Sequence, residues 1–533
     1  MSKKKFQDLK DLIGALKKEE IILAKKHLTA FESYHTRASS KMLRLLNLIL
    51  KESNIDFEKV KKLIGNDITI KSYNQLISRT LVRIEESLIL DINLSRKKGY
   101  TPVFRNRLKI RKLIVQASIL QGRGLANYAL KNYNWIIRTA KKFELYDELI
   151  ETLFLKQAIV FTKEGAKEYD AISKQINIYE DCREKLRASK DLYRTYFAEV
   201  SFKGKVQNKE YDLETRIKKL ESFVEITKSA NIANYMYLLK LEYAFVAKKY
   251  DYGLKVGQMF VDTLIENPVI FSNIRIGYVY FNISDNEISA IRFKSAIDFG
   301  LKAKKTLSNY KSINYLVTLD FLATAYFFDS QPNEAEKQIQ ELESLRIIDK
   351  YPFHKGKMFY QKAMIHFKRK SFRESNLILN NIPEIEKDKE GWNVWIRIMR
   401  ILCSIEMLKL NLIDYDVESF RKYIQRIDKK YTVGKREKLI LKLLIELDRK
   451  NFDFHLVARE ESKILDELNV ISGETSWDPK SPELILFHFW FESKINGANY
   501  VPDLLRYKGR HNIKTVESEN NPSDESNQLA IEF

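Results

Sequence analysis

A helical hairpin recurs about every 40 residues along this chain, and that repeat constrains the fold more than any other feature. Several copies open their second helix with an aromatic residue close to a small one, as in Gly124–Ala129, Tyr250–Gly253 and Phe372–Ser375. One hairpin cannot bury its own apolar face, so such units stack on one another. The repeat therefore predicts an α-solenoid.

The amino-acid composition agrees with an all-α chain. Only 17 of the 533 residues are glycine and 9 are proline, the residues that turns in sheet proteins and loop-rich proteins need. Leucine, isoleucine, lysine and glutamate are abundant, as in chains made mostly of helices. Hydrophobic residues make up 44% of the chain, which is enough for a continuous core along stacked repeats.

The helical periodicity divides the chain into three segments. Residues 1–95 are predicted to form a small N-terminal helical domain, with helices at Lys41–Lys51, Asp56–Ile64 and Lys71–Leu90. Residues 104–506 are predicted to form the solenoid. Residues 507–533 are polar and acidic, and we expect a disordered tail there.

The second helices of the hairpins are predicted to begin at breaks in the apolar periodicity. These breaks lie near Gly124, Gly165, Lys209, Tyr252, Asn286, Pro332, Phe372, Asp416 and Asp453. The hairpin from Leu316 shows the pattern best, because small residues at Ala323 and Ala335 would let its two helices approach closely. Its inner faces carry large apolar residues, namely Leu319, Leu322, Tyr326, Ile339 and Leu342.

This spacing resembles that of the tetratricopeptide (TPR) family. Three hairpins match its pattern of large, small and aromatic positions: Leu319, Leu322, Ala323, Tyr326 and Ala335; Leu113, Ala117, Leu120, Gly124 and Ala129; and Phe359, Ala363 and Leu379, with Ser375 at the usual alanine. The chain is also similar to helical-repeat proteins of Bacteroidota at Gly124–Ala129 and Trp395–Tyr415. These resemblances imply a binding surface and carry no active-site residues.

The sequence lacks the motifs of common enzyme classes. It contains no phosphate-binding P-loop, no Gly-x-Ser-x-Gly nucleophile elbow and no His-Glu-x-x-His. The seven histidines are dispersed, and two cysteines, Cys182 and Cys403, are too few for a four-cysteine zinc site. We therefore expect no enzymatic activity, no cofactor and no metal.

The sequence also shows no targeting segment. Charged residues follow the N-terminus, and no stretch reaches the roughly 18 apolar residues that a membrane span needs. We expect a cytoplasmic protein that does not enter a membrane.

A run of basic residues is the strongest candidate for a binding site. Most of the net charge of +21 lies in residues 1–150, and no Asp or Glu occurs between Ile92 and Phe143. The run contains Arg96, Lys97, Lys98, Arg105, Arg107, Lys109, Arg111 and Lys112. Such charge asymmetry suggests an acidic or polyanionic partner. The alternative is that the cations form a solvated face with no function.

Aromatic residues are interleaved with this run, and they raise nucleic-acid binding as a second hypothesis. Tyr128, Tyr133 and Trp135 would suit base stacking if they were exposed, and they are ordinary repeat core if they are buried. The order Asp56–Ile64, turn, Lys71–Leu90 also fits a helix-turn-helix, although any short helical hairpin gives the same pattern. Its second helix would offer Lys71, Tyr73, Asn74, Gln75, Ser78 and Arg79 to DNA.

Together these patterns predict a non-enzymatic scaffold that holds a protein or peptide in a superhelical groove. The alternative is a nucleic-acid-binding protein that uses the basic N-terminal third. The sequence leaves the partner and the oligomeric state open.

Overall fold

In a computed structural model of the chain, the described residues are 2–16, 18–29, 39–52, 55–65, 68–90, 101–163, 165–200, 209–386, 388, 391–428 and 433–508. Within these ranges every regular element is a helix, and no strand occurs. The chain divides into two compact units, residues 1–180 and 181–533. The predicted all-α class is confirmed.

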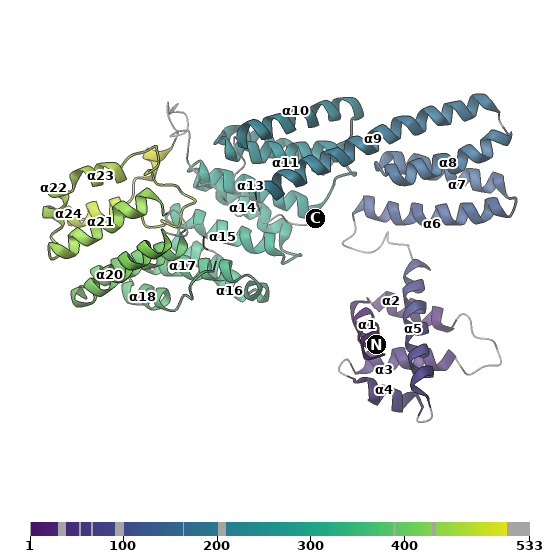
Figure 1. Cartoon of the computed structure of the whole chain (residues 1–533), viewed down its shortest axis with the longest axis horizontal. Coiled ribbons are helices and arrows are strands. Elements are labelled where there is room, and N and C mark those ends of the chain that lie inside the picture. The colour runs from purple at the N-terminus through teal and green to yellow at the C-terminus, as the bar shows by residue number, and fades with distance from the viewer. Residues whose placement is uncertain are drawn as a thin grey trace. The chain divides into compact units, whose positions relative to one another are not determined.

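The first five helices form a small bundle (Figure 1). They are α1 (Ser2–Ala15), α2 (Lys18–Thr29), α3 (Ser39–Lys51), α4 (Phe57–Ile64) and α5 (Ile70–Leu90). The long α5 packs against α1, α2 and α3, and the shared core contains Leu9, Leu45, Val60 and Ile77. The three helices predicted in this region correspond to α3, α4 and α5.

The bundle uses two of the side chains that the helix-turn-helix hypothesis assigned to DNA. Tyr73 is fully buried; its ring centroid lies 4.9 Å from that of Phe57, and its hydroxyl donates to the Phe57 carbonyl at 3.3 Å. Ser78 accepts a hydrogen bond from Lys5 of α1 at 3.2 Å. The assignment of Tyr73 to DNA was wrong, because its buried ring packs on Phe57 of α4.

Antiparallel helical hairpins make up the rest of the structure. Within residues 102–198, α6 (Pro102–Gly122) pairs with α7 (Ala126–Lys142), and α8 (Tyr146–Lys163) is followed by α9 (Ala166–Ala198). A single helix, α10 (Lys209–Thr227), then packs on α11.

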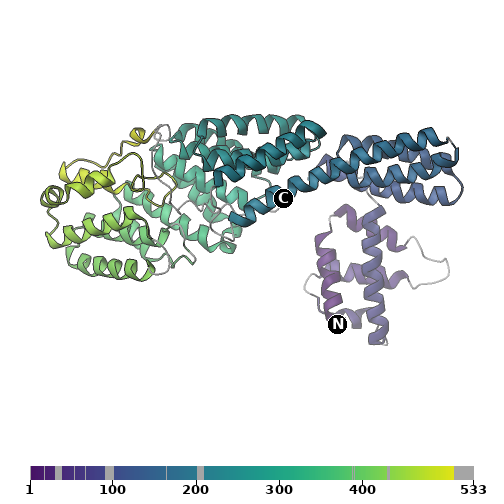
Figure 2. The ribbon, with the colours of Figure 1, turned by 45° about the horizontal axis from the view of Figure 1, so that its top comes forward.

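Six further hairpins stack within residues 230–460 (Figures 1 and 2). They are α11 (Ala230–Val246) with α12 (Tyr250–Glu266), α13 (Asn273–Ser289) with α14 (Phe293–Leu307), α15 (Ile313–Phe328) with α16 (Pro332–Ser344), α17 (Pro352–Lys368) with α18 (Phe372–Asn380), α19 (Trp392–Glu406) with α20 (Leu410–Ile427), and α21 (Lys435–Arg449) with α22 (Phe454–Glu460). The smaller elements are η3 (Arg346–Lys350), α23 (Ser462–Leu468), α24 (Phe487–Ile495) and η4 (Leu504–Tyr507).

Two positions, twelve residues apart, mark where the helices of a hairpin approach most closely. In one hairpin the Ser284 hydroxyl of α13 donates to the Ala296 carbonyl of α14 at 2.7 Å. In another the Ser375 hydroxyl of α18 donates to the Ala363 carbonyl of α17 at 2.8 Å. A hydroxyl can reach the neighbouring backbone only if both side chains are small, so these positions exclude large residues.

Ala323 and Ala335 occupy the same two positions of the α15–α16 hairpin, and both are buried. The first-helix positions Ser284, Ala323 and Ala363 follow one another at intervals of 39 and 40 residues. Stacking of successive hairpins is equally close: a Cβ added at Gly300 of α14 would lie 2.6 Å from Leu322 of α15. The hairpins are therefore TPR-like in packing, with the longer pitch that the sequence predicts.

A similar turn joins the two helices of most hairpins. One residue with positive φ, such as Ile291 (59°), Lys370 (62°) or Leu408 (57°), follows the first helix. The next amide then bonds back to a helix carbonyl, as from Arg292 to Glu287 at 2.8 Å. This is the Schellman arrangement, which usually places glycine at the left-handed position.

Two predicted helix starts were wrong because this turn carries no sequence signal here. Asn286 lies inside α13, and the second helix begins seven residues later, at Phe293. Asp416 lies inside α20, which begins at Leu410. The turns at Ile291 and Leu408 contain no glycine or proline, so the apolar pattern runs through them unbroken.

Replacing Leu408 by glycine should stabilise the protein. Leu408 has a φ of 57° and is 81% exposed, so the substitution relieves left-handed strain and removes little packing. We expect a gain of about 1 kcal/mol in the free energy of unfolding, measured by urea denaturation. Leu408→Ala is the matched control and should give no such gain, because alanine has the same left-handed penalty. Equal stability of the two variants would contradict the assignment of strain.

Candidate partner-binding site

The clearest peptide-like contact in the structure is intramolecular, because one segment of the chain packs across the repeat helices. Residues 469–486, which join α23 to α24, contain no helix, and we call them the crossing segment. They run across the first helices of several hairpins. The Trp477 ring is fully buried, with its centroid 5.4 Å from that of Phe328 at the end of α15. The Tyr360 hydroxyl of α17 donates to the Pro482 carbonyl at 2.8 Å.

The tip of the crossing segment is a tight turn that presents Lys480. The Ser481 amide donates to the Asp478 carbonyl at 2.9 Å, and the Asp478 carboxylate accepts from the Lys480 amide at 2.9 Å. Asp at the first position and Pro479 at the second favour this turn. The Lys480 ammonium lies 2.8 Å from the Asp285 carboxylate of α13 and 4.1 Å from the ring centroid of Phe245 of α11.

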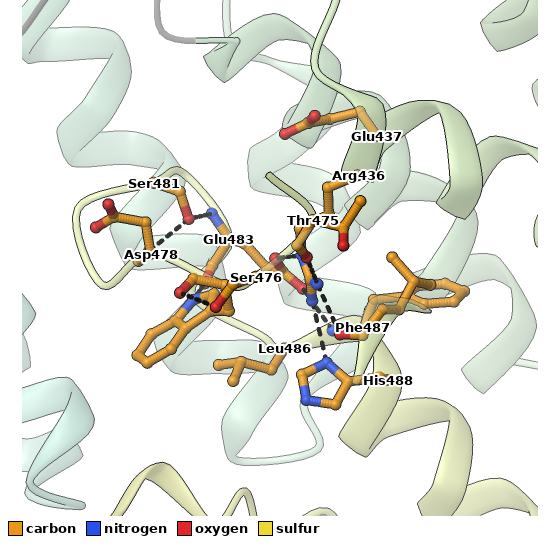
Figure 3. Close-up of polar contacts among 12 residues, drawn as sticks. Arg436, Glu437, Thr475, Ser476, Asp478, Ser481, Glu483, Leu486, Phe487 and His488 are labelled. Carbon is orange, nitrogen blue, oxygen red and sulfur yellow. Dashed lines mark hydrogen bonds and ion pairs between the residues drawn. The ribbon is translucent and has the colours of Figure 1, made fainter. Parts of the chain in front are cut away.

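Arg436 of α21 holds the other end of the crossing segment (Figure 3). Its guanidinium forms a two-point ion pair with Glu483, with Nη2 to Oε1 at 2.8 Å. Its Nη1 donates to the carbonyls of Leu468 and Thr475 at 2.8 and 2.7 Å. Nη2 also lies 3.0 Å from Nδ1 of His488. All five guanidinium N–H groups therefore have an acceptor, which is what makes a buried arginine tolerable.

His488 is neutral in this arrangement. Because arginine can only donate, Nδ1 of His488 must accept, and the proton lies on Nε2. That atom is 2.9 Å from the Tyr507 hydroxyl, so it donates to Tyr507. Burial, with Arg436 and Arg506 nearby, lowers the pKa of His488 to about 2. The histidine thus joins α24 and η4 to the Arg436 network.

This network predicts a loss of stability in mild acid. His488 stays neutral when folded but takes up a proton below its ordinary pKa of 6.5 when unfolded. The unfolded state therefore binds more protons, and stability falls as pH drops below 6.5, by about 1.4 kcal/mol per pH unit. His488→Asn keeps an acceptor for Arg436 and removes the titration.

We expect wild type to lose about 2 kcal/mol more than His488→Asn between pH 6.5 and 5. The measurement is urea denaturation followed by tryptophan fluorescence at both pH values. Every other titrating group is present in both proteins, so the difference between their changes in unfolding free energy reports on His488 alone. The same pH dependence in both would contradict a neutral, buried His488.

A pocket lies beside the tip of the crossing segment, between α9, α11 and α13. Its enclosed volume is small, about 20 Å³ or room for about one water molecule, and the pocket opens to solvent. Its walls combine four aromatic side chains with two carboxylates: Tyr193, Phe197, Phe245, Tyr278, Glu242 and Asp285. No sequence motif marked these residues, because they come from three helices and have no characteristic spacing.

Glu242 is the buried acid of this pocket. It is 9% exposed, and it accepts a hydrogen bond from the Tyr196 hydroxyl at 3.1 Å. Burial raises the pKa of Glu242 to about 6, although the Tyr196 hydrogen bond and the positive charge of Lys480 oppose the rise. Its negative charge at neutral pH is therefore poorly compensated, and a nearby cation would stabilise it.

The structure places five of the predicted basic residues on α6. Arg96, Lys97 and Lys98 lie outside the described residues. Two of the five contact an acid that the sequence pattern did not include. The Nε atoms of Arg107 and Arg111 lie 3.3 and 2.9 Å from Oε1 of Glu148, a residue of α8 that is 3% exposed.

The aromatic residues near this run have different environments. Tyr133 is buried, and its hydroxyl donates to Gln121 at 2.9 Å. Trp135 is half-buried, with the Lys109 ammonium 4.4 Å from its ring centroid. Tyr128 is 60% exposed, and Lys131 lies 5.5 Å from its ring centroid. Base stacking is therefore excluded for Tyr133, and the three rings do not form one exposed platform.

The remaining basic residues of the run on α6 are Arg105 and Lys112.

Arg107 and Arg111 should contribute to folding, contrary to a purely solvated face. Replacing both by Gln removes two cations that pair with the buried Glu148. Because the arginine side chains are 44% and 64% exposed, we expect a local loss of only about 1 kcal/mol. Adding Glu148→Gln to that variant should restore at least half of the loss. Hydrogen exchange of the α8 amides measures both changes. If the effects of the arginine substitutions and of Glu148→Gln simply added, the arginines and Glu148 would not be energetically coupled.

The described residues form no metal site and no membrane span. Both cysteines are buried thiols. In the ranges that the structure describes, no group of three or more His, Cys, Asp or Glu side chains could hold a metal ion. The helices described include none with the length and apolar character to cross a membrane.

Comparisons with known proteins add little to this picture. No protein-family description matches the chain, and no curated protein matches it. Among solved structures, it is similar to a signal transduction ATPase with numerous domains (STAND) protein with a tetratricopeptide repeat sensor from Pyrococcus horikoshii. Identity is 12% and the TM-score 0.41; the match covers 83% of this chain and 66% of that one. A score this low carries no functional argument, and the similarity to Bacteroidota repeat proteins stays a prediction.

Proposed function

We propose that this chain is a non-enzymatic scaffold that binds a protein or peptide partner on the first helices of its 181–533 repeats. One observation carries the proposal: the crossing segment, which is not helical, already lies on this surface. It is held there by a buried ring, by the backbone contact from Tyr360 and by the Lys480 ion pair with Asp285. A surface that binds its own non-helical segment in this way has the chemistry for a peptide in trans.

The crossing segment also limits where the partner binds. Trp477 and residues 484–487 are buried, so they belong to the core over α15, α17 and α21 and do not leave the surface without unfolding it. The pocket between α9, α11 and α13 is next to this segment and opens to solvent. We assign the partner to that pocket and its surroundings, in a cytoplasmic protein without a cofactor.

Nucleic-acid binding through the basic run is the second candidate. Its support is the exposed ring of Tyr128 beside Lys131, together with the basic residues of α6. The pairing of Arg107 and Arg111 with Glu148 reduces the charge available to phosphates. We therefore place this candidate below peptide binding.

Selection from a displayed library of random peptides tests the scaffold. Wild type should enrich a peptide family, and Asn282→Trp, which fills the pocket, should lose it. Tyr415→Trp places the same new ring on a residue that is 77% exposed on α20, and it should keep the peptides. Failure of wild type to enrich any peptide would count against the scaffold.

A labelled DNA duplex is the competing probe in the same assay. Tight binding of the duplex, with an affinity that falls steeply with salt, would favour the second candidate instead.

A further inference from the structure

The pocket between α9, α11 and α13 has the composition of a cation site. Two carboxylates, Glu242 and Asp285, face it together with the rings of Tyr193, Phe245 and Tyr278. Carboxylates attract a positive charge at short range, and aromatic faces add cation–π attraction in a partly desolvated site. An anion would meet repulsion there, and a neutral apolar group would add no compensation for the buried charge of Glu242.

One cation already occupies the edge of this pocket. The Lys480 ammonium is 2.8 Å from Asp285 and 4.1 Å from the ring centroid of Phe245. It therefore contacts both a carboxylate and an aromatic side chain of the pocket. Lys480 comes from a position 195 residues away in sequence, which makes it a tethered occupant. The Lys480 side chain is 25% exposed, whereas Trp477 and Glu483 on either side are buried. The tip can therefore change its contacts while its flanks stay anchored.

We propose that this pocket receives a lysine or arginine side chain of a peptide partner, and that Lys480 competes with it for Asp285. The inference rests on the proposed scaffold function and gives its recognition chemistry. Entry of the partner's cation between Glu242 and Asp285 requires the Lys480 ammonium to give up part of its ion pair. The crossing segment thereby acts as a built-in competitor that lowers the affinity for partners.

Competition by a tethered group has a quantitative signature. The measured dissociation constant equals the intrinsic constant divided by the fraction of molecules in which Lys480 has left Asp285. Removing the ammonium should therefore tighten binding of a cation by about three- to tenfold. Removing a pocket carboxylate should weaken it.

The probe is Nα-acetyl-lysine methylamide, titrated into the full-length protein and followed by NMR. Nα-acetyl-norleucine methylamide has the same apolar stem without the charge and is the control ligand. Lys480→Ala should bind the lysine probe about three- to tenfold more tightly than wild type, and Glu242→Gln more weakly. Lys480→Arg keeps the ion pair and should resemble wild type. Circular dichroism and thermal melting establish that each variant is folded.

Peptide selection separates failure of this inference from failure of the scaffold function. Peptides enriched by wild type should carry Lys or Arg, and Lys480→Ala should enrich them more strongly. Enrichment of peptides without a cation, unaffected by Glu242→Gln or Lys480→Ala, would overturn the cation site and leave the scaffold intact. Equal binding of the lysine and norleucine probes would overturn it as well. No enrichment at all would remove the scaffold itself.

Discussion

The ion pair between Arg436 and Glu483 is the interaction on which the C-terminal half of the repeat depends. Both side chains are buried, and such a pair is tolerated only when every remaining hydrogen-bonding group has a partner. Here the carbonyls of Leu468 and Thr475 and the ring of His488 supply those partners. One guanidinium thereby joins α21, the crossing segment and α24. It fixes the base of the segment, and the position of Lys480 follows from it.

That anchoring changes what the solenoid presents to other molecules. A repeat of this kind offers an open surface along its first helices. In this chain the crossing segment covers that surface over α15, α17 and α21, where Trp477 and Tyr360 make their contacts. The proposed function therefore assigns partner binding to the part of the surface near α11 and α13. The proposed peptide site is a pocket beside Lys480 and not a long groove.

The net charge of the basic run differs between the sequence and the folded protein, because an acid from another helix pairs with two of its arginines. Fifty-two consecutive residues, 92–143, contain no acid, and the sequence alone makes them strongly electropositive. Folding brings Glu148 of α8 between Arg107 and Arg111. Sequence reasoning missed this acid because it lies five residues beyond the run and on the next first helix. Aligning the successive hairpins would have predicted this contact, because the first helices of adjacent repeats pack side by side.

The sequence by itself determined the all-α class, the N-terminal bundle and the repeat, because apolar periodicity and small residues such as Ala323 and Ala335 act locally. It also placed the helix starts that a glycine or proline marks, such as those after Gly165 and at Pro332. Turns built on Ile291 or Leu408 were missed, because their left-handed residues are imposed by packing of the two helices and not by local preference. Only the tertiary structure decided where the crossing segment lies and which charges meet. Contacts such as Lys480 with Asp285 join residues far apart in sequence, and no local pattern encodes them.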